Sequence, residues 1–199
     1  MKAFWISLTV CTSAVLLFAD KKNEGKFSPG PASSYQNKQT NDKVTVAVTA
    51  YDTEELAHTA FGKLDPNQYG VLPVLVIIQN DTDQALKLDH LEVDYTGIDG
   101  RDVEATPAAD VQVLNGGMKP HMPTGTPLPH REKKNPLNVL EIESRSFSAK
   151  MLPAHDSASG FFYFQTDHRP GAKFFLTGIK EAASGKDFFY FEIPIDIHR

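Results

Sequence analysis

The side chains best suited to bind a transition metal lie in one short stretch. Met118, His121 and Met122 occur close together, and His130 follows further along. Thioether and imidazole groups suit Cu(I). The stretch has no pattern of regular structure that would hold these ligands in place, and the basic run beside it disfavours a bound cation. A periplasmic copper carrier is therefore an alternative function, and no metal site is favoured.

Three consecutive residues, His155, Asp156 and Ser157, have the side-chain types of a hydrolase triad. Catalysis needs these groups to converge in space beside an oxyanion site, which three neighbours in one loop cannot do among themselves. The chain also lacks the G-x-S-x-G pattern that presents a nucleophilic serine. A polar turn is the favoured interpretation, and an unrecognised hydrolase is the second alternative. We expect no enzymatic activity.

Several aspartates near predicted turns offer the oxygen ligands that calcium prefers. Their spacing lacks the D-x-D-x-D-G pattern of a calcium loop, and aspartate is common in turns for backbone reasons. The chain has neither a P-loop nor a dinucleotide fingerprint, so no cofactor is expected. The aspartates are Asp81, Asp83, Asp89, Asp99 and Asp102.

The densest positive run of the chain is formed by Arg131, Lys133 and Lys134. It lies in residues 116–136, which contain five prolines and few apolar residues, so we expect a long surface loop. The run suits steering toward an anionic partner, and these three residues are the candidate partner-binding residues. A tolerated insertion without a partner is the equally weighted alternative.

The N-terminus predicts export. Residues 1–19 have a basic start at Lys2, a mostly apolar core and a cleavage position at Ala19, as secretory signal peptides do. The expected location is secreted or periplasmic, and the alternative is a membrane tether through an uncleaved N-terminus. Lipid attachment at Cys11 is disfavoured because Val10, not a small residue, precedes it.

Cleavage would leave a chain without cysteine and with an acidic balance. It would remove one of the 20 basic residues and none of the 25 acidic ones, which gives a net charge of −6. Nucleic-acid binders normally carry a basic surface, so nucleic acid is not an expected partner. No stable membrane span is expected after cleavage. Residues 20–42 are polar and proline-rich and are predicted to form a flexible tether.

The most apolar stretch after the signal peptide, residues 71–78, reads VLPVLVII and should organise the fold. An uninterrupted apolar run of this length predicts a strand that is covered on both faces. Pro73 has no amide hydrogen, so it should lie at an edge or before strand pairing begins. A short helix after a cap at Asp52 should help to cover this strand, and Gly62 should end the helix.

Further strands are predicted on both sides of this stretch. Residues 44–51 alternate, Asp99–Gly100 marks a hairpin, and the apolar parity switches near Asp89, which indicates a bend. Strand patterns resume over residues 139–151, 161–164, 174–179 and 188–195. Asn80 also begins an Asn-Asp-Thr glycosylation sequon, which turn chemistry explains equally well.

These patterns predict an all-β fold, an immunoglobulin-like antiparallel β-sandwich of seven or eight strands with one or two short helices and a long proline-rich loop. The sandwich should span residues 43–199. The order VLPVLVIIQNDTDQALKLDHLEVDY, FSAKMLPAHDSASGFFYFQ and FFYFEIPI resembles a family of secreted, uncharacterised bacterial proteins. It resembles small immunoglobulin-like envelope domains more loosely. The resemblance covers residues 43–197, implies a bacterial source and carries over no catalytic residue.

The favoured function is that of an exported, non-enzymatic sandwich that binds another envelope or extracellular macromolecule. The partner is an unknown envelope protein or other macromolecule. The sequence does not fix the oligomeric state.

Overall fold

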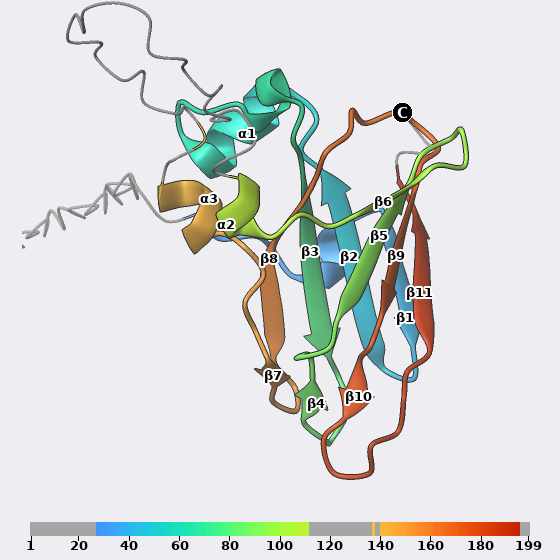
Figure 1. Cartoon of the computed structure of the whole chain (residues 1–199). Coiled ribbons are helices and arrows are strands. Elements are labelled where there is room, and N and C mark those ends of the chain that lie inside the picture. Colours follow the sequence, from blue (N-terminus) through green and yellow to red (C-terminus); the bar gives the residue numbers. More distant parts are fainter. Residues whose placement is uncertain (1–26, 112–136, 138–139, 196–199) are drawn as a thin grey trace, which may run out of the picture.

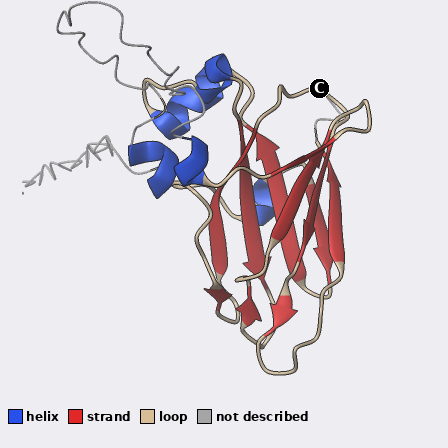
Figure 2. Ribbon diagram, viewed as in Figure 1, coloured by secondary structure: helices blue, strands red, loops and turns tan. Residues whose placement is uncertain are grey.

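The computed structural model describes residues 27–111, 137 and 140–195. Within these residues the protein has eleven strands in three antiparallel sheets and few helices (Figures 1 and 2). The prediction of an all-β fold is therefore confirmed. The predicted numbers of strands and helices were too low, because three strands have only two residues each and three short α-helices are present.

The first sheet contains the apolar strand predicted at residues 71–78. That strand, β3 (Leu72–Asn80), lies between β2 (Val44–Ala50) and β8 (Ser157–Phe164), and β1 (Lys38–Asn41) completes the sheet. Because β3 pairs along both of its edges, it is the central strand of this sheet.

The second sheet has the order β11-β9-β5-β6. A small third sheet, with the order β10-β4-β7, lies at one end of the molecule (Figure 1). The bend predicted near Asp89 separates β4 from β5, so it marks the point where the chain passes from the third sheet to the second. The strands are β4 (Leu86–Lys87), β5 (Glu92–Thr96), β6 (Asp102–Glu104), β7 (Met151–Leu152), β9 (Lys173–Thr177), β10 (Lys180–Glu181) and β11 (Tyr190–Pro194).

The side chains of β3 are buried on both faces of the first sheet. Val74 and Val76 belong to a core shared with the second sheet, whereas Leu75 and Ile77 belong to a separate core under the helices. The prediction of a strand covered on both faces is therefore confirmed. The molecule has three layers, namely helices, first sheet and second sheet (Figure 2).

Helices cover the outer face of the first sheet near one end. α1 begins after Thr53, whose hydroxyl accepts a hydrogen bond from the amide of Leu56, so the cap lies one residue after the predicted Asp52. Gly62, with φ of 69°, ends α1 as predicted. No helix of the described residues is long and apolar enough to cross a membrane. The helices are η1 (Ala32–Ser34), α1 (Glu54–Phe61), η2 (Pro66–Tyr69), α2 (Ala108–Val111) and α3 (Leu140–Ser144).

The strand predicted over residues 139–151 was wrong in its first half, which forms α3 instead. An alternating pattern predicts a strand with one apolar face. In a segment this short, a helix can also bury a single apolar residue in the core. Ile142 is that residue, and it is fully buried in the core under the helices. Only β7 and an isolated bridge at Ser146 are extended pairings in this segment.

The predicted tether of residues 20–42 was too long. Residues 38–41 form β1, which pairs with β2, and Phe27 and Tyr35 pack against the core under the helices. The stretch is mostly polar, so its composition predicted a tether, although its few aromatic residues pack against the core. The predicted signal peptide, residues 1–19, lies outside the described residues.

Pro73 does not lie at an edge of the first sheet, but it precedes the strand pairing with β2, which begins at Val74. It pairs with Tyr163 of β8, and its carbonyl accepts a hydrogen bond from the Tyr51 amide at 2.9 Å, where β2 has ended. The carbonyl of Tyr51 accepts 2.8 Å away from the side-chain amide of Asn67. Pro73 has no amide hydrogen to donate to the Tyr51 carbonyl, so the side chain of Asn67 donates in its place.

Candidate functional site

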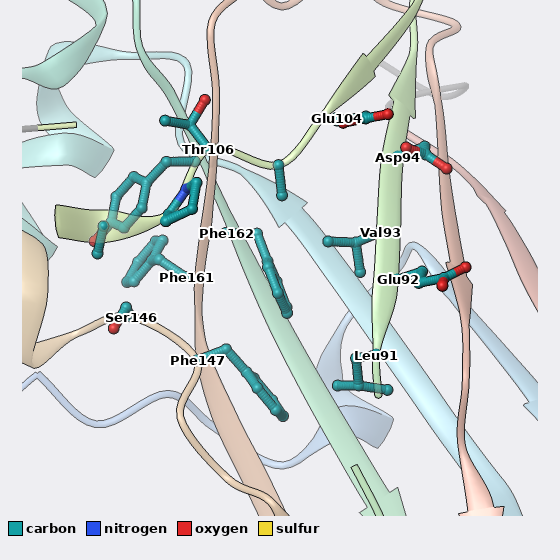
Figure 3. Close-up of a pocket in the computed structure, with 14 residues that line it drawn as sticks. Leu91, Glu92, Val93, Asp94, Glu104, Thr106, Ser146, Phe147, Phe161 and Phe162 are labelled. Carbon is teal, nitrogen blue, oxygen red and sulfur yellow. The ribbon is translucent and has the colours of Figure 1, made fainter. Parts of the chain in front are cut away.

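The sandwich is joined along one side and open along the other. On the joined side, the Asn41 side-chain amide donates to the Tyr190 carbonyl at 3.2 Å, and the Glu192 amide donates to the Gln39 side chain at 2.8 Å. These bonds link β1 to β11. On the opposite side, a groove lies between β5 of the second sheet and β8 of the first (Figure 3).

The chain segments that cross this open side position the groove. After β6 the chain passes from the second sheet to the first, where the Thr106 amide donates to the Tyr163 carbonyl at 2.7 Å. The segment after α3 lies along β8, where the Phe147 amide donates to the Phe161 carbonyl at 3.0 Å. Gly160 permits this approach, because a Cβ at that position would clash with the backbone of Phe147.

Apolar side chains form the floor of the groove, which has a volume of about 660 Å³. The rings of Phe147 and Phe162 stack with centroids 5.4 Å apart and an interplanar angle of 17°. Figure 3 shows these rings facing Leu91 and Val93 of the opposite wall. Pockets of this size and apolar character are typical ligand-binding sites.

The hydroxyl groups that line the groove are already hydrogen-bonded. Ser146 donates to the Glu143 carbonyl at 2.7 Å, and Thr106 accepts from the Gln165 side chain at 3.2 Å. Tyr163 donates to the Ile142 carbonyl, and burial raises the pKa of its phenol. The described residues that line the groove include no histidine or cysteine.

Three carboxylates lie at the β5–β6 edge of the groove, those of Glu92, Asp94 and Glu104, which are called the acidic rim below. The side chains of Glu92 and Asp94 lie on the other side of β5 from Phe147 and Phe162, on the outer face of the second sheet (Figure 3). Asp94 lies directly opposite Glu104 in the strand register. Burial, and then the negative charges of Glu104, Asp102 and Glu92, raise the pKa of Asp94 above its ordinary value. The rim is therefore a region of concentrated negative charge.

The acidic rim adjoins the rest of the outer face of the second sheet. In one row across the sheet, Glu192 pairs with Phe175, and Phe175 pairs with Asp94. Lys173 forms an ion pair with Glu192 at 2.5 Å, and Tyr190 is 56% exposed. No described helix covers this face, in contrast to the outer face of the first sheet (Figure 2).

The candidate residues of the proline-rich segment lie outside the described residues. This set comprises both the copper-ligand candidates and the partner-binding candidates, so the structure describes none of them. They are Met118, His121, Met122, His130, Arg131, Lys133 and Lys134.

The three triad-type residues do not form a relay. The imidazole Nε2 of His155 lies 3.2 Å from Oδ1 of Asp83, and the carboxylate of Asp156 accepts from the amide of Ser157 at 2.7 Å. The second bond is local to the turn before β8. His155 has φ of 58°, which is also typical of a turn residue.

The aspartates considered as calcium ligands serve their own turns and strands. Asp81 accepts from the Gln79 side chain, Asp99 accepts from the Arg101 amide, and Asp102 accepts from the Thr96 hydroxyl at 2.6 Å. Among the described residues, no group of three or more His, Cys, Asp or Glu side chains is arranged to hold a metal ion.

The groove itself was not predicted from the sequence. A two-residue turn at Asp99–Gly100, the commonest Asp-Gly hairpin, would place Asp94 opposite Ala105, whereas the observed register places it opposite Glu104, so the hairpin signal does not predict the acidic rim. The meeting of the two walls could not be predicted either, because β5 lies before residues 112–136 and the wall formed by residues 146–147 and β8 lies after them. No protein-family model matches the chain, and no curated protein shows significant similarity to it.

Proposed function

We propose that this chain is an exported, non-enzymatic module with an immunoglobulin-like sandwich, and that it binds another envelope or extracellular macromolecule at the groove. The observation that carries this proposal is a groove of about 660 Å³ with an apolar floor, whose lining hydroxyls are already hydrogen-bonded and which opens on the unjoined side of the sandwich. Such a groove offers apolar area that a ligand can bury.

The strand order supports the immunoglobulin-like assignment. In such domains strands A, B and E share one sheet, while C, F and G share the other and the variable type adds C′. Here β2, β3 and β8 are neighbours in the first sheet in the positions of A, B and E. In the second sheet, β11, β9, β5 and β6 take the order G-F-C-C′.

Two features of the sequence support export and the envelope as the place of action. Residues 1–19 have the composition of a signal peptide, and the rest of the chain has no cysteine that would require oxidation or protection. The quoted strand motifs resemble those of secreted bacterial proteins. A partner in the same compartment is therefore the partner that the protein would meet.

A matched pair of variants tests the proposal. Leu91→Gln changes a groove residue, and Leu140→Gln makes the same change on α3, where Leu140 is 78% exposed and outside the groove lining. Chains carrying residues 20–199 would be crosslinked in envelope extracts, and captured macromolecules would be identified by mass spectrometry. We expect Leu91→Gln to reduce capture of a specific partner at least about tenfold, with Leu140→Gln as wild type.

Equal capture by wild type and Leu91→Gln would contradict the proposal that the groove is the binding surface. Circular dichroism of both variants would control for misfolding. Leu91 is only partly buried, so the change should leave most of the core intact.

A further inference from the structure

We infer that the groove recognises a cationic protein segment in extended conformation, with apolar side chains on the aromatic floor and Lys or Arg side chains at the acidic rim. This inference rests on the proposed binding function of the groove. It adds the chemistry of the ligand, namely its charge, its conformation and the spacing of its apolar residues.

The sign of the ligand charge follows from the lining. The charged residues at the edge of the groove, Glu92, Asp94 and Glu104, are all acidic, and their side chains lie on the outer side of β5 and β6. Among the described residues, neither Asp94 nor Glu104 forms an ion pair with a basic side chain. A ligand with positive charge is therefore complementary, whereas an acidic ligand would meet three like charges.

The strand register supports a binding role for these carboxylates. Asp94 and Glu104 lie directly opposite each other on β5 and β6, an arrangement that destabilises a strand pair. Asp102 adds a third carboxylate on the same strand pair, although its oxygen accepts from Thr96. A bound Lys or Arg side chain would offset the repulsion between these carboxylates. Binding of a cationic partner would therefore remove an unfavourable interaction that is present in the free domain.

The walls of the groove favour an extended segment over a helix. One wall is the start of β5 and the other is the extended segment at residues 146–147 beside β8 (Figure 3). Both walls are extended backbone, so a segment in extended conformation can lie alongside them. In an extended segment, alternate side chains point to opposite sides. Apolar residues at every second position would then face Phe147 and Phe162.

Synthetic peptides with capped ends provide the probe. A peptide of about five residues that alternates lysine and leucine would be titrated into the chain of residues 20–199, beside one that alternates glutamate and leucine and one that alternates lysine and glycine. Amide chemical shifts in NMR spectra would locate binding, and calorimetry would give affinities. We expect only the lysine–leucine peptide to bind measurably, with the largest shifts at Leu91, Phe147 and Phe162.

Charge-neutral variants test the role of the acidic rim. Asp94→Asn combined with Glu104→Gln should weaken binding of the lysine–leucine peptide at least about fivefold and flatten its salt dependence. Asp81→Asn combined with Asp83→Asn removes the same charge at a distant turn and should leave the affinity within about twofold, because long-range effects are screened.

Three outcomes would overturn the inference. Groove shifts of equal size with the glutamate–leucine peptide would show that charge is not recognised, while the capture experiment with Leu91→Gln could still support the groove. The absence of groove shifts with every peptide would exclude an extended segment of this kind. Groove shifts that grow with protein concentration, without peptide, would assign the groove to a second copy of the chain.

Discussion

At the scale of single residues, Asp94 shows how a cluster of like charges, here in the proposed binding surface, can oppose stability. Its pKa is raised by burial and by neighbouring carboxylates, so the folded state favours the protonated form more than the unfolded state does. A carboxyl group of this kind destabilises the fold at pH values above its folded pKa. The destabilisation disappears as the pH falls through the folded pKa toward the ordinary value.

Asp94→Asn should therefore stabilise the free domain near neutral pH. Because Asp94 remains partly exposed and its repulsion is screened, the gain in the free energy of unfolding should be below about 1 kcal/mol. Thermal melts of wild type and variant should differ at about pH 7 and converge at about pH 3, where the wild-type carboxyl is protonated. A variant that is less stable than wild type at neutral pH would contradict this explanation.

Gly160 is the residue on which the aromatic wall of the groove depends. Gly160→Ala would push a methyl group into the backbone of Phe147, so the 146–147 segment would have to move away from β8. We expect a loss of about 1–3 kcal/mol in the free energy of unfolding, measured by urea denaturation. Ser159→Ala, in the same strand, is the control and should change the stability by less than about 0.5 kcal/mol.

At the scale of elements, the sequence predicted best those strands whose side chains pack the core. Residues 71–78 and the Asp99–Gly100 hairpin lie where their patterns indicated, because burial on both faces and turn chemistry are local signals. The α3 segment was predicted incorrectly, since its helical form depends on packing beneath α1 and α2. β1 was missed because its pairing with β2 adds little apolar surface of its own.

The groove depends on pairings that no local pattern specifies. The register that places Asp94 opposite Glu104 differs from that of a two-residue turn at Asp99–Gly100. The aromatic wall depends on how the segment after α3 returns to β8, and this wall lies after residues 112–136, whereas β5 lies before them.

The cap of α1 offers a test at the same scale. The Thr53 hydroxyl accepts from the Leu56 amide at 3.3 Å, whereas Asp52 lies one position earlier. Thr53→Ala should reduce the free energy of unfolding by about 0.5–2 kcal/mol, because an amide of the first helical turn loses its partner. Asp52→Ala should be milder, and equal losses in the two variants by chemical denaturation would argue against Thr53 as the cap.

At the scale of the whole molecule, the domain begins earlier than its composition indicates. Phe27 packs edge-to-face against Tyr51 with ring centroids 6.0 Å apart, and Ala32 is 1% exposed in the core under the helices. Residues 27–42 therefore belong to the folded unit. They also provide β1, which carries the bonds that join the two sheets along one side.

A chain that starts at residue 43 should consequently be less stable than one that starts at residue 27. Loss of Phe27, Ala32 and Tyr35 from the core, together with the β1 ladder, should lower the free energy of unfolding by about 3 kcal/mol or more. For a domain of this size that corresponds to a fall in Tm of about 6–12 °C. Equal melting temperatures in calorimetry would restore the tether interpretation.

Asn80 has a consequence for how the protein is produced. Its amide nitrogen donates to the carbonyls of Gln84 and Pro153, both at 2.8 Å, and its oxygen accepts from the Thr82 hydroxyl at 2.7 Å. The residue is fully buried although it begins an acceptor sequon. A eukaryotic secretory host adds sugar to the nascent chain, before these bonds form, so a glycan here would occupy the nitrogen that the folded turn requires. A host without this modification is therefore the appropriate choice for recombinant material.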